Sequence, residues 1–145
     1  MSIICFGEVL LDKFPNYKKI GGAPLNVALR LSSFHLPVQF VSRIGRDADG
    51  ELILKHLKEE GLSTEFIQYS ENLATGEVMV HLDAEGVASY TIEEPRAWDE
   101  IECNDALLDA VSKSEAFVFG SLIARNPVSR NTSFQLLPKA EFKVF

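Results

Sequence analysis

Two patterns of apolar residues, short continuous runs and residues at helical spacing, alternate along the chain. They predict strands and helices in turn. The short apolar run at 3–6 is typical of a strand that is buried on both faces of a sheet, and the runs at 38–44 and 116–119 also predict strands. Between the first two runs, apolar residues recur at helical spacing from Leu25 onward, which predicts a helix over 25–34. This alternation predicts an α/β fold built on a mostly parallel sheet flanked by helices.

A second helix is predicted over 46–61, where apolar residues share one face and both ends carry capping residues. Asp47 or Asp49 can act as the N-cap, and Gly61 can end the helix. Its expected core face consists of Leu52, Ile53 and Leu57. The same signals predict, in chain order, a strand near 66–69, a helix from Asn104 to Ser112, a helix over 127–137, and the start of a strand at 142–145.

The segment 76–94 has a different pattern, because apolar and polar residues alternate one by one. Val78, Val80 and Leu82 fall on one face, and the residues at 83–86 have the composition of a turn. This pattern predicts an antiparallel β-hairpin that is added to the strand and helix units.

Composition and charge exclude several classes of protein. The 145 residues are enough for one domain with a sizeable core. A net charge of −7 and a pI near 4.9 argue against a nucleic-acid or anionic-membrane partner. No apolar run reaches the length of a membrane span, and the first residues lack the basic region of a signal peptide. Cys5 and Cys103 are too few for a disulfide framework or a zinc site, so a reducing, cytoplasmic location is expected.

The residues at 142–145 have the pattern of a buried strand that is just beginning. Ligands of open parallel sheets bind beyond the carboxyl ends of the strands. We therefore expect the chain to be a fragment of a longer protein, in which the residues after this strand contribute to the site.

Candidate chemistry is concentrated in the segment KKIGGAPLNVALRLSSF at 18–34. One interpretation is mechanical: Gly21 and Gly22 form a turn, and Pro24 begins the helix. The other is chemical: glycines without a Cβ let the backbone approach a ligand, and Asn26 directs its amide toward it.

Metal chemistry is not expected. The acids at 47–50 have only part of a calcium-loop pattern, so capping is favoured there, and the three histidines lack the spacing of metal ligands.

Five segments, in this order and at these spacings, resemble a known family. They are GEVLLD at 7–12, GGAPLNVA at 21–28, SRIGRDADGE at 42–51, EEGLST at 59–64 and ATGEVMVHLDAEG at 74–86. Together they resemble the N-terminal half of the ribokinase-like (PfkB-type) carbohydrate kinases, and within that family its fructokinase-like branch. The resemblance covers all 145 residues as the N-terminal part of a ribokinase-like domain.

The resemblance implies phosphoryl transfer from ATP, with Mg²⁺, to a sugar hydroxyl. It implies that the sugar lies between the main sheet and a small β lid, here the hairpin at about 76–94, and that such lids pair in a homodimer. It places sugar-binding roles on Asp12, at the end of the first strand, and on Gly21, Gly22 and Asn26. The family's Gly-Ala-Gly-Asp motif, which carries the catalytic aspartate, does not occur in this chain. We therefore expect no catalytic residue and no ATP or Mg²⁺ site here, and no activity from this chain alone.

The residue types agree with a sugar site. Neighbouring hydroxyls can donate two charge-assisted hydrogen bonds to an ionised carboxylate such as Asp12, and Asn26 offers both a donor and an acceptor. The structural alternatives are that Asp12 is a solvated loop acid, that the glycines only form a turn, and that Asn26 is a surface residue.

The end of the hairpin bears on the choice of sugar. Many members of the family have a basic residue near the position of Glu94, where a carboxylate would repel a sugar acid or a sugar phosphate. A neutral sugar is therefore expected, although a small shift in register would let Arg96 reach the site.

Trp98 is expected in the core or over the pocket. The alternative function is a non-catalytic sugar-binding or assembly module.

Overall fold

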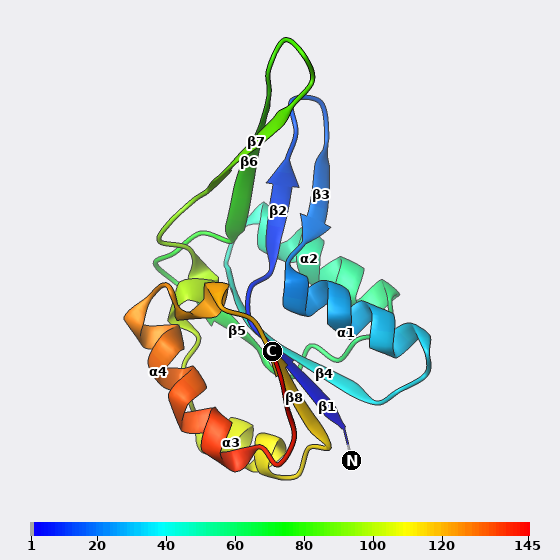
Figure 1. Ribbon diagram of the computed structural model, residues 1–145, viewed down its shortest axis with the longest axis vertical. Coiled ribbons are helices and arrows are strands. Elements are labelled where there is room, and N and C mark those ends of the chain that lie inside the picture. The colour runs from blue at the N-terminus through cyan, green and yellow to red at the C-terminus, as the bar shows by residue number, and fades with distance from the viewer. Residues whose placement is uncertain (1) are drawn as a thin grey trace.

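The computed structural model describes residues 2–145 and contains two sheets (Figure 1). The main sheet has five parallel strands in the order β5-β4-β1-β8-β9. Their bounds are β1 Ile3–Phe6, β4 Val38–Gly45, β5 Ile67–Ser70, β8 Ala116–Phe119 and β9 Lys143–Val144. Each predicted strand of the main sheet is therefore confirmed, and so is the parallel α/β architecture.

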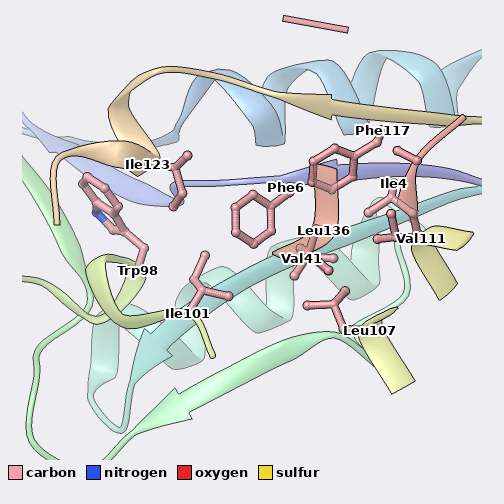
Figure 2. Close-up of a cluster of buried hydrophobic side chains, with 11 residues drawn as sticks. Ile4, Phe6, Val41, Trp98, Ile101, Leu107, Val111, Phe117, Ile123 and Leu136 are labelled. Carbon is pink, nitrogen blue, oxygen red and sulfur yellow. The ribbon is translucent and has the colours of Figure 1, made fainter. Parts of the chain in front are cut away.

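Helices cover both faces of the main sheet and enclose a hydrophobic core on each (Figure 1). The bounds are α1 Ala23–Ser33, α2 Ala48–Glu59, α3 Asp105–Ser112 and α4 Pro127–Leu136, with single 3-10 turns η1 Ala97–Glu100, η2 Leu122–Ala124 and η3 Leu137–Lys139. Leu25, Ile53 and Leu57 pack against one face of the sheet. Figure 2 shows the cluster on the other face, where Trp98 lies near Ile123 at one end.

The helix ends follow the predicted capping. The side chain of Asp47 accepts a hydrogen bond from the backbone N–H of Gly50 at 2.8 Å, so Asp47 rather than Asp49 is the N-cap of α2. Gly61 has a φ of +73°, which suits a glycine after the helix end. One part of the prediction is wrong: Leu52 is 43% exposed, because the buried stripe of α2 runs through Ile53, Leu54 and Leu57. One residue of offset turns a side chain by about 100° around the axis.

The second sheet has four strands in the order β3-β2-β6-β7 and extends from one end of the main sheet (Figure 1). Its bounds are β2 Leu10–Lys13, β3 Lys18–Gly21, β6 Gly76–Leu82 and β7 Ala88–Ile92. The antiparallel pairing of β6 with β7 confirms the predicted hairpin. Strands β2 and β3 were not predicted, and they make the hairpin one half of a sheet instead of an isolated appendage.

Trp98 is fully buried, which settles its place in the core, and Cys5 is also fully buried. None of the helices within residues 2–145 combines the length and the apolar character that a membrane crossing requires.

Candidate functional site

Asp12 lies in β2 of the second sheet, which corrects the expectation that it follows the first strand. In register it is flanked by Lys19 of β3 and Val78 of β6. A Cβ added to Gly21 would lie 3.0 Å from Oδ2 of Asp12, so the carboxylate rests against the glycine at the end of β3. The structure thus brings Asp12 to the point where β3 ends and α1 is about to begin.

The environment of Asp12 alters its titration. Burial raises the pKa of the Asp12 carboxyl above its ordinary value, and the positive charge of Lys19 partly opposes that shift. The side chain is only half-buried, so it remains open to a ligand.

Gly22 is the N-cap of α1 and has a φ of +118°, a conformation that strongly favours glycine. A Cβ at this position would clash with the backbone carbonyl oxygen of Glu8. The loop between β1 and β2 fills the space beside Gly22, and this contact explains the glycine without a ligand. The mechanical interpretation holds for Gly22, which connects β3 to α1, whereas Gly21 is the last residue of β3 and the helix begins at Ala23, one residue before Pro24. A sugar-binding role for Gly22 stays a prediction.

Asn26 lies in the first turn of α1, where its backbone N–H donates to the carbonyl of Gly22 at 2.9 Å. Its side chain is exposed, and within residues 2–145 its amide makes no hydrogen bond. The structure therefore places Asn26 one helical turn beyond the glycines with its donor and acceptor free.

Glu8 is a second carboxylate at this junction, and the sequence analysis did not select it. The residue is only 4% exposed, and its Oε1 accepts a hydrogen bond from the N–H of Ala23 at 3.2 Å. Its Oε2 is buried without a partner among the described residues. Burial raises the pKa of Glu8, opposed by hydrogen bonds from its own N–H and that of Ala23, and by the charge of Arg125. An acidic residue inside an apolar segment was the signal that could have identified it.

The two charged groups considered at the end of the hairpin have different surroundings. Glu94 is 68% exposed and lies 3.5 Å from Arg125. Arg96 instead binds Oε1 of Glu77 at 2.6 Å. Glu77 is in register with Leu11 and not with Asp12, so its side chain occupies the opposite face of the second sheet. The guanidinium of Arg96 is therefore held away from the face that carries Asp12.

The acids of the β4–α2 turn have a structural role. Oδ1 and Oδ2 of Asp47 accept hydrogen bonds from the hydroxyl and the N–H of Thr75, at 2.6 and 2.8 Å. Although burial alone would raise the pKa of Asp47, these bonds and the one from Gly50 hold it below its ordinary value. Across residues 2–145, no group of three or more His, Cys, Asp or Glu side chains is arranged to hold a metal ion.

Comparisons with known proteins bear on the family and the fold of the chain. Residues 5–142 match the pfkB family of carbohydrate kinases. A putative sugar kinase of Pyrococcus horikoshii is 34% identical over 131 residues, which are 90% of this chain and 40% of that protein. A probable fructokinase of Arabidopsis thaliana is 29% identical over 133 residues, covering 83% of this chain and 41% of that protein.

Solved structures show the same fold. The crystal structure of a fructokinase from Xylella fastidiosa with bound ATP has a TM-score of 0.85 at 27% identity, over 97% of this chain and 45% of that one. The Pyrococcus horikoshii sugar kinase in complex with ATP has a TM-score of 0.83 at 29% identity, over 94% of this chain and 49% of that one. The chain thus spans less than half the length of these relatives. The fold is ribokinase-like, and the chain belongs to the pfkB family of carbohydrate kinases.

Proposed function

We propose that this chain is the sugar-binding portion of an ATP-dependent kinase that phosphorylates a neutral, fructose-like sugar. The observation that carries the proposal is the junction between the two sheets, where the half-buried carboxylate of Asp12 rests against Gly21. A carboxylate held at the edge of a glycine turn can accept hydrogen bonds from two adjacent hydroxyls.

In this proposal each residue has a separate task. Asp12 accepts hydrogen bonds from the sugar hydroxyls, and Asn26 supplies one donor and one acceptor from the first turn of α1. The backbone at Gly21 and Gly22 keeps that turn close to β2. None of these groups needs to take a proton from the reacting hydroxyl.

ATP and Mg²⁺ belong to the proposed activity of a longer protein. Phosphoryl transfer requires groups that position the phosphates of ATP and stabilise the developing charge, and the family's Gly-Ala-Gly-Asp motif is missing from this sequence. We therefore propose that the 145 residues alone do not phosphorylate a sugar.

The charges near the junction support a neutral substrate. Lys19 already faces Asp12, and Arg96 is engaged by Glu77 on the other face. Glu94 adds an exposed negative charge at the end of the hairpin. A phosphate or carboxylate on the sugar would meet no free cation from Arg96 and would be repelled by Glu94.

The β6–β7 hairpin is proposed to act as the lid and to pair with a second copy in a homodimer. Val78 and Val80 are buried within the chain, so they are not available to a second copy. Leu82, Tyr90 and Ile92 remain 52, 62 and 41% exposed, and the register places them on the same face as the two valines. Replacing Leu82 and Tyr90 with glutamate should give a monomer by light scattering. A parent chain that is already monomeric at micromolar concentration would contradict the dimer.

A cytoplasmic location is also part of the proposal. Both cysteines are free thiols, and burial raises the pKa of Cys5 to about 12, which leaves that thiol inert.

The decisive experiment uses a full-length kinase that carries this sequence. Fructose should be phosphorylated with ATP, and a sugar acid or a sugar phosphate should not. The 145-residue chain alone is tested in parallel for ATP-dependent turnover and, by calorimetry, for fructose binding. Turnover by the isolated chain would refute the proposed division of roles. A full-length protein that binds fructose without phosphorylating it would favour a non-catalytic sugar-binding module, the alternative that the chain's short span keeps open.

A further inference from the structure

Arg125 follows η2, on the segment that leaves the carboxyl end of β8 in the main sheet. Its guanidinium binds Asp99 through two hydrogen bonds, Nε to Oδ1 at 2.6 Å and Nη2 to Oδ2 at 2.7 Å. Asp99 is 1% exposed, and the side chain of Arg125 is 16% exposed. This bidentate pair, with Asp99 buried and Arg125 partly buried, joins η2 to η1.

The same guanidinium also contacts the end of the hairpin. Nη2 of Arg125 donates to the backbone carbonyl of Glu93 at 2.8 Å, one residue after β7 ends. Its Nη1 lies 3.5 Å from the carboxylate of Glu94. Arg125 thus holds the returning strand of the hairpin through a main-chain and a side-chain group.

The first strand of the hairpin, β6, begins against Trp98, and Trp98 in turn contacts Arg125. The centre of the Arg125 guanidinium lies 4.0 Å from the centroid of the Trp98 ring, within the range of a cation–π contact. A Cβ added to Gly76, the first residue of β6, would lie 2.6 Å from that ring. Both ends of the hairpin therefore converge on the stacked pair of Arg125 and Trp98.

Arg125 also acts toward the candidate sugar site. Its positive charge lowers the pKa of Glu8, against the larger effect of burial. Glu8 in turn accepts the hydrogen bond from Ala23 at the start of α1. One guanidinium is therefore within electrostatic reach of the α1 turn while it holds the hairpin by direct contact.

We propose that Arg125 is a positioning residue that fixes the orientation of the β6–β7 hairpin relative to Asp12 and the α1 turn. It touches no substrate in this arrangement. An arginine suits the task because its planar fork satisfies Asp99 and the carbonyl of Glu93 at once, whereas a lysine ammonium cannot reproduce that geometry. The effect on sugar kinetics rests on the proposed function, while the effect on the hairpin does not.

The test compares Arg125→Lys with a matched control, Arg43→Lys. Arg43 has a similar exposure of 14% and also holds the η1 region, through the carbonyl of Glu100 at 2.5 Å and the carboxylate of Glu102 at 3.1 Å. Neither of these partners belongs to the hairpin strands β6 and β7. Both variants should lower the melting temperature, so thermal stability alone does not separate them.

Hydrogen exchange on the 145-residue chain separates the two roles. In Arg125→Lys, amides of 76–92 should exchange at least about fivefold faster than in Arg43→Lys, with β1 and β8 unchanged, because the hairpin loses hydrogen bonds at its root. Equal exchange of 76–92 in the two variants would overturn the proposal. If Arg125→Lys does not fold, the double variant Arg125→Gln/Asp99→Asn removes both buried charges, and the same comparison decides.

In the full-length kinase, Arg125→Lys should raise the KM for fructose about tenfold while the KM for ATP changes less than about twofold, because only the sugar side is misplaced. Arg43→Lys should leave both constants near those of the parent. A fructose KM that does not respond to Arg125→Lys would overturn the positioning role, even with a loosened hairpin. A parent enzyme that phosphorylates no sugar would refute the proposed function instead, and the exchange experiment would still decide whether Arg125 holds the hairpin.

Discussion

Replacing Asn26 with alanine separates a binding role from a structural one. The side chain is exposed in the first turn of α1, and within residues 2–145 its amide makes no hydrogen bond. Its removal therefore breaks no side-chain hydrogen bond within residues 2–145. The backbone N–H of this residue, which donates to the carbonyl of Gly22, is unchanged by the substitution.

The expected effect on stability is small and positive. Alanine is the better helix former by about 0.5 kcal/mol, since asparagine competes for backbone hydrogen bonds in non-helical conformations. For a chain of this size, that gain corresponds to an increase of about 1–2 °C in the melting temperature.

The expected effect on sugar binding has the opposite sign. The amide can make two hydrogen bonds to sugar hydroxyls, each with a net contribution of roughly 0.5–1.5 kcal/mol. Losing both should weaken binding by about 1–3 kcal/mol, which is on the order of fivefold to 150-fold.

Two assays measure the two effects independently. Calorimetric unfolding of the 145-residue chain gives the melting temperature, and initial rates of the full-length kinase give the KM values for fructose and ATP. Val27→Ala is the matched control, since Val27 is the next residue of α1 and is also exposed, at 38%. It should leave the fructose KM unchanged. A lower melting temperature in Asn26→Ala together with an unchanged fructose KM would refute a binding role.

Three further substitutions test Asp12, Gly22 and the structural role of Asp47. Asp12→Ala should weaken fructose binding by about 1.5–3 kcal/mol, and in the parent enzyme the fructose KM should rise on acidification at a pH above the ordinary aspartate value, because the pKa of Asp12 is raised; a flat pH profile would contradict this. Gly22→Ala should destabilise the chain in thermal unfolding because its Cβ meets the carbonyl of Glu8 at a φ of +118°, and an unchanged melting temperature would show that the turn relaxes. Asp47→Ala should lower the free energy of unfolding by roughly 1.5–3 kcal/mol near neutral pH. Since the pKa of Asp47 is lowered, its contribution is present above the unfolded value and is lost as the pH falls through the folded one, so the two proteins should converge in acid.

The main sheet could be predicted because its strands are short apolar runs between helices with clear ends. Asn104 caps α3 by accepting a hydrogen bond from the N–H of Leu107, as its position before the apolar residues indicated. Local signals of this kind depend only on neighbouring residues, and tertiary packing did not override them here.

Strands β2 and β3 could not be predicted because their side chains do not alternate in the usual way. Leu10 and Leu11 are both buried on opposite faces, and Lys18 and Lys19 are both exposed although they are adjacent in β3. The partner of β2 on its other side is β6, more than 60 residues later in the sequence. Pairing over such a distance leaves no local pattern, and the true position of Asp12 depends on it.

Arg125 was missed for a related reason. Nothing near it in the sequence marks it, since its partners Trp98, Asp99 and Glu93 lie 26 to 32 residues earlier in the chain. A partly buried arginine of this kind can be identified only when the fold shows the buried carboxylate that it binds.

The two interpretations of the glycine turn are compatible, because each glycine meets a different acidic residue. Gly22 allows the backbone of Glu8 to approach, and Gly21 allows the carboxylate of Asp12 to approach. The structural requirement at Gly22 fixes where α1 begins, and that start determines where Asn26 lies relative to Asp12. Glu8 lies at the start of α1 although its buried, partly unpaired carboxylate disfavours the fold when it is ionised. The carboxylate of Glu8 thus opposes stability at the start of α1, the helix that carries Asn26. A role of α1 in ligand binding explains this cost better than a turn that only reverses the chain.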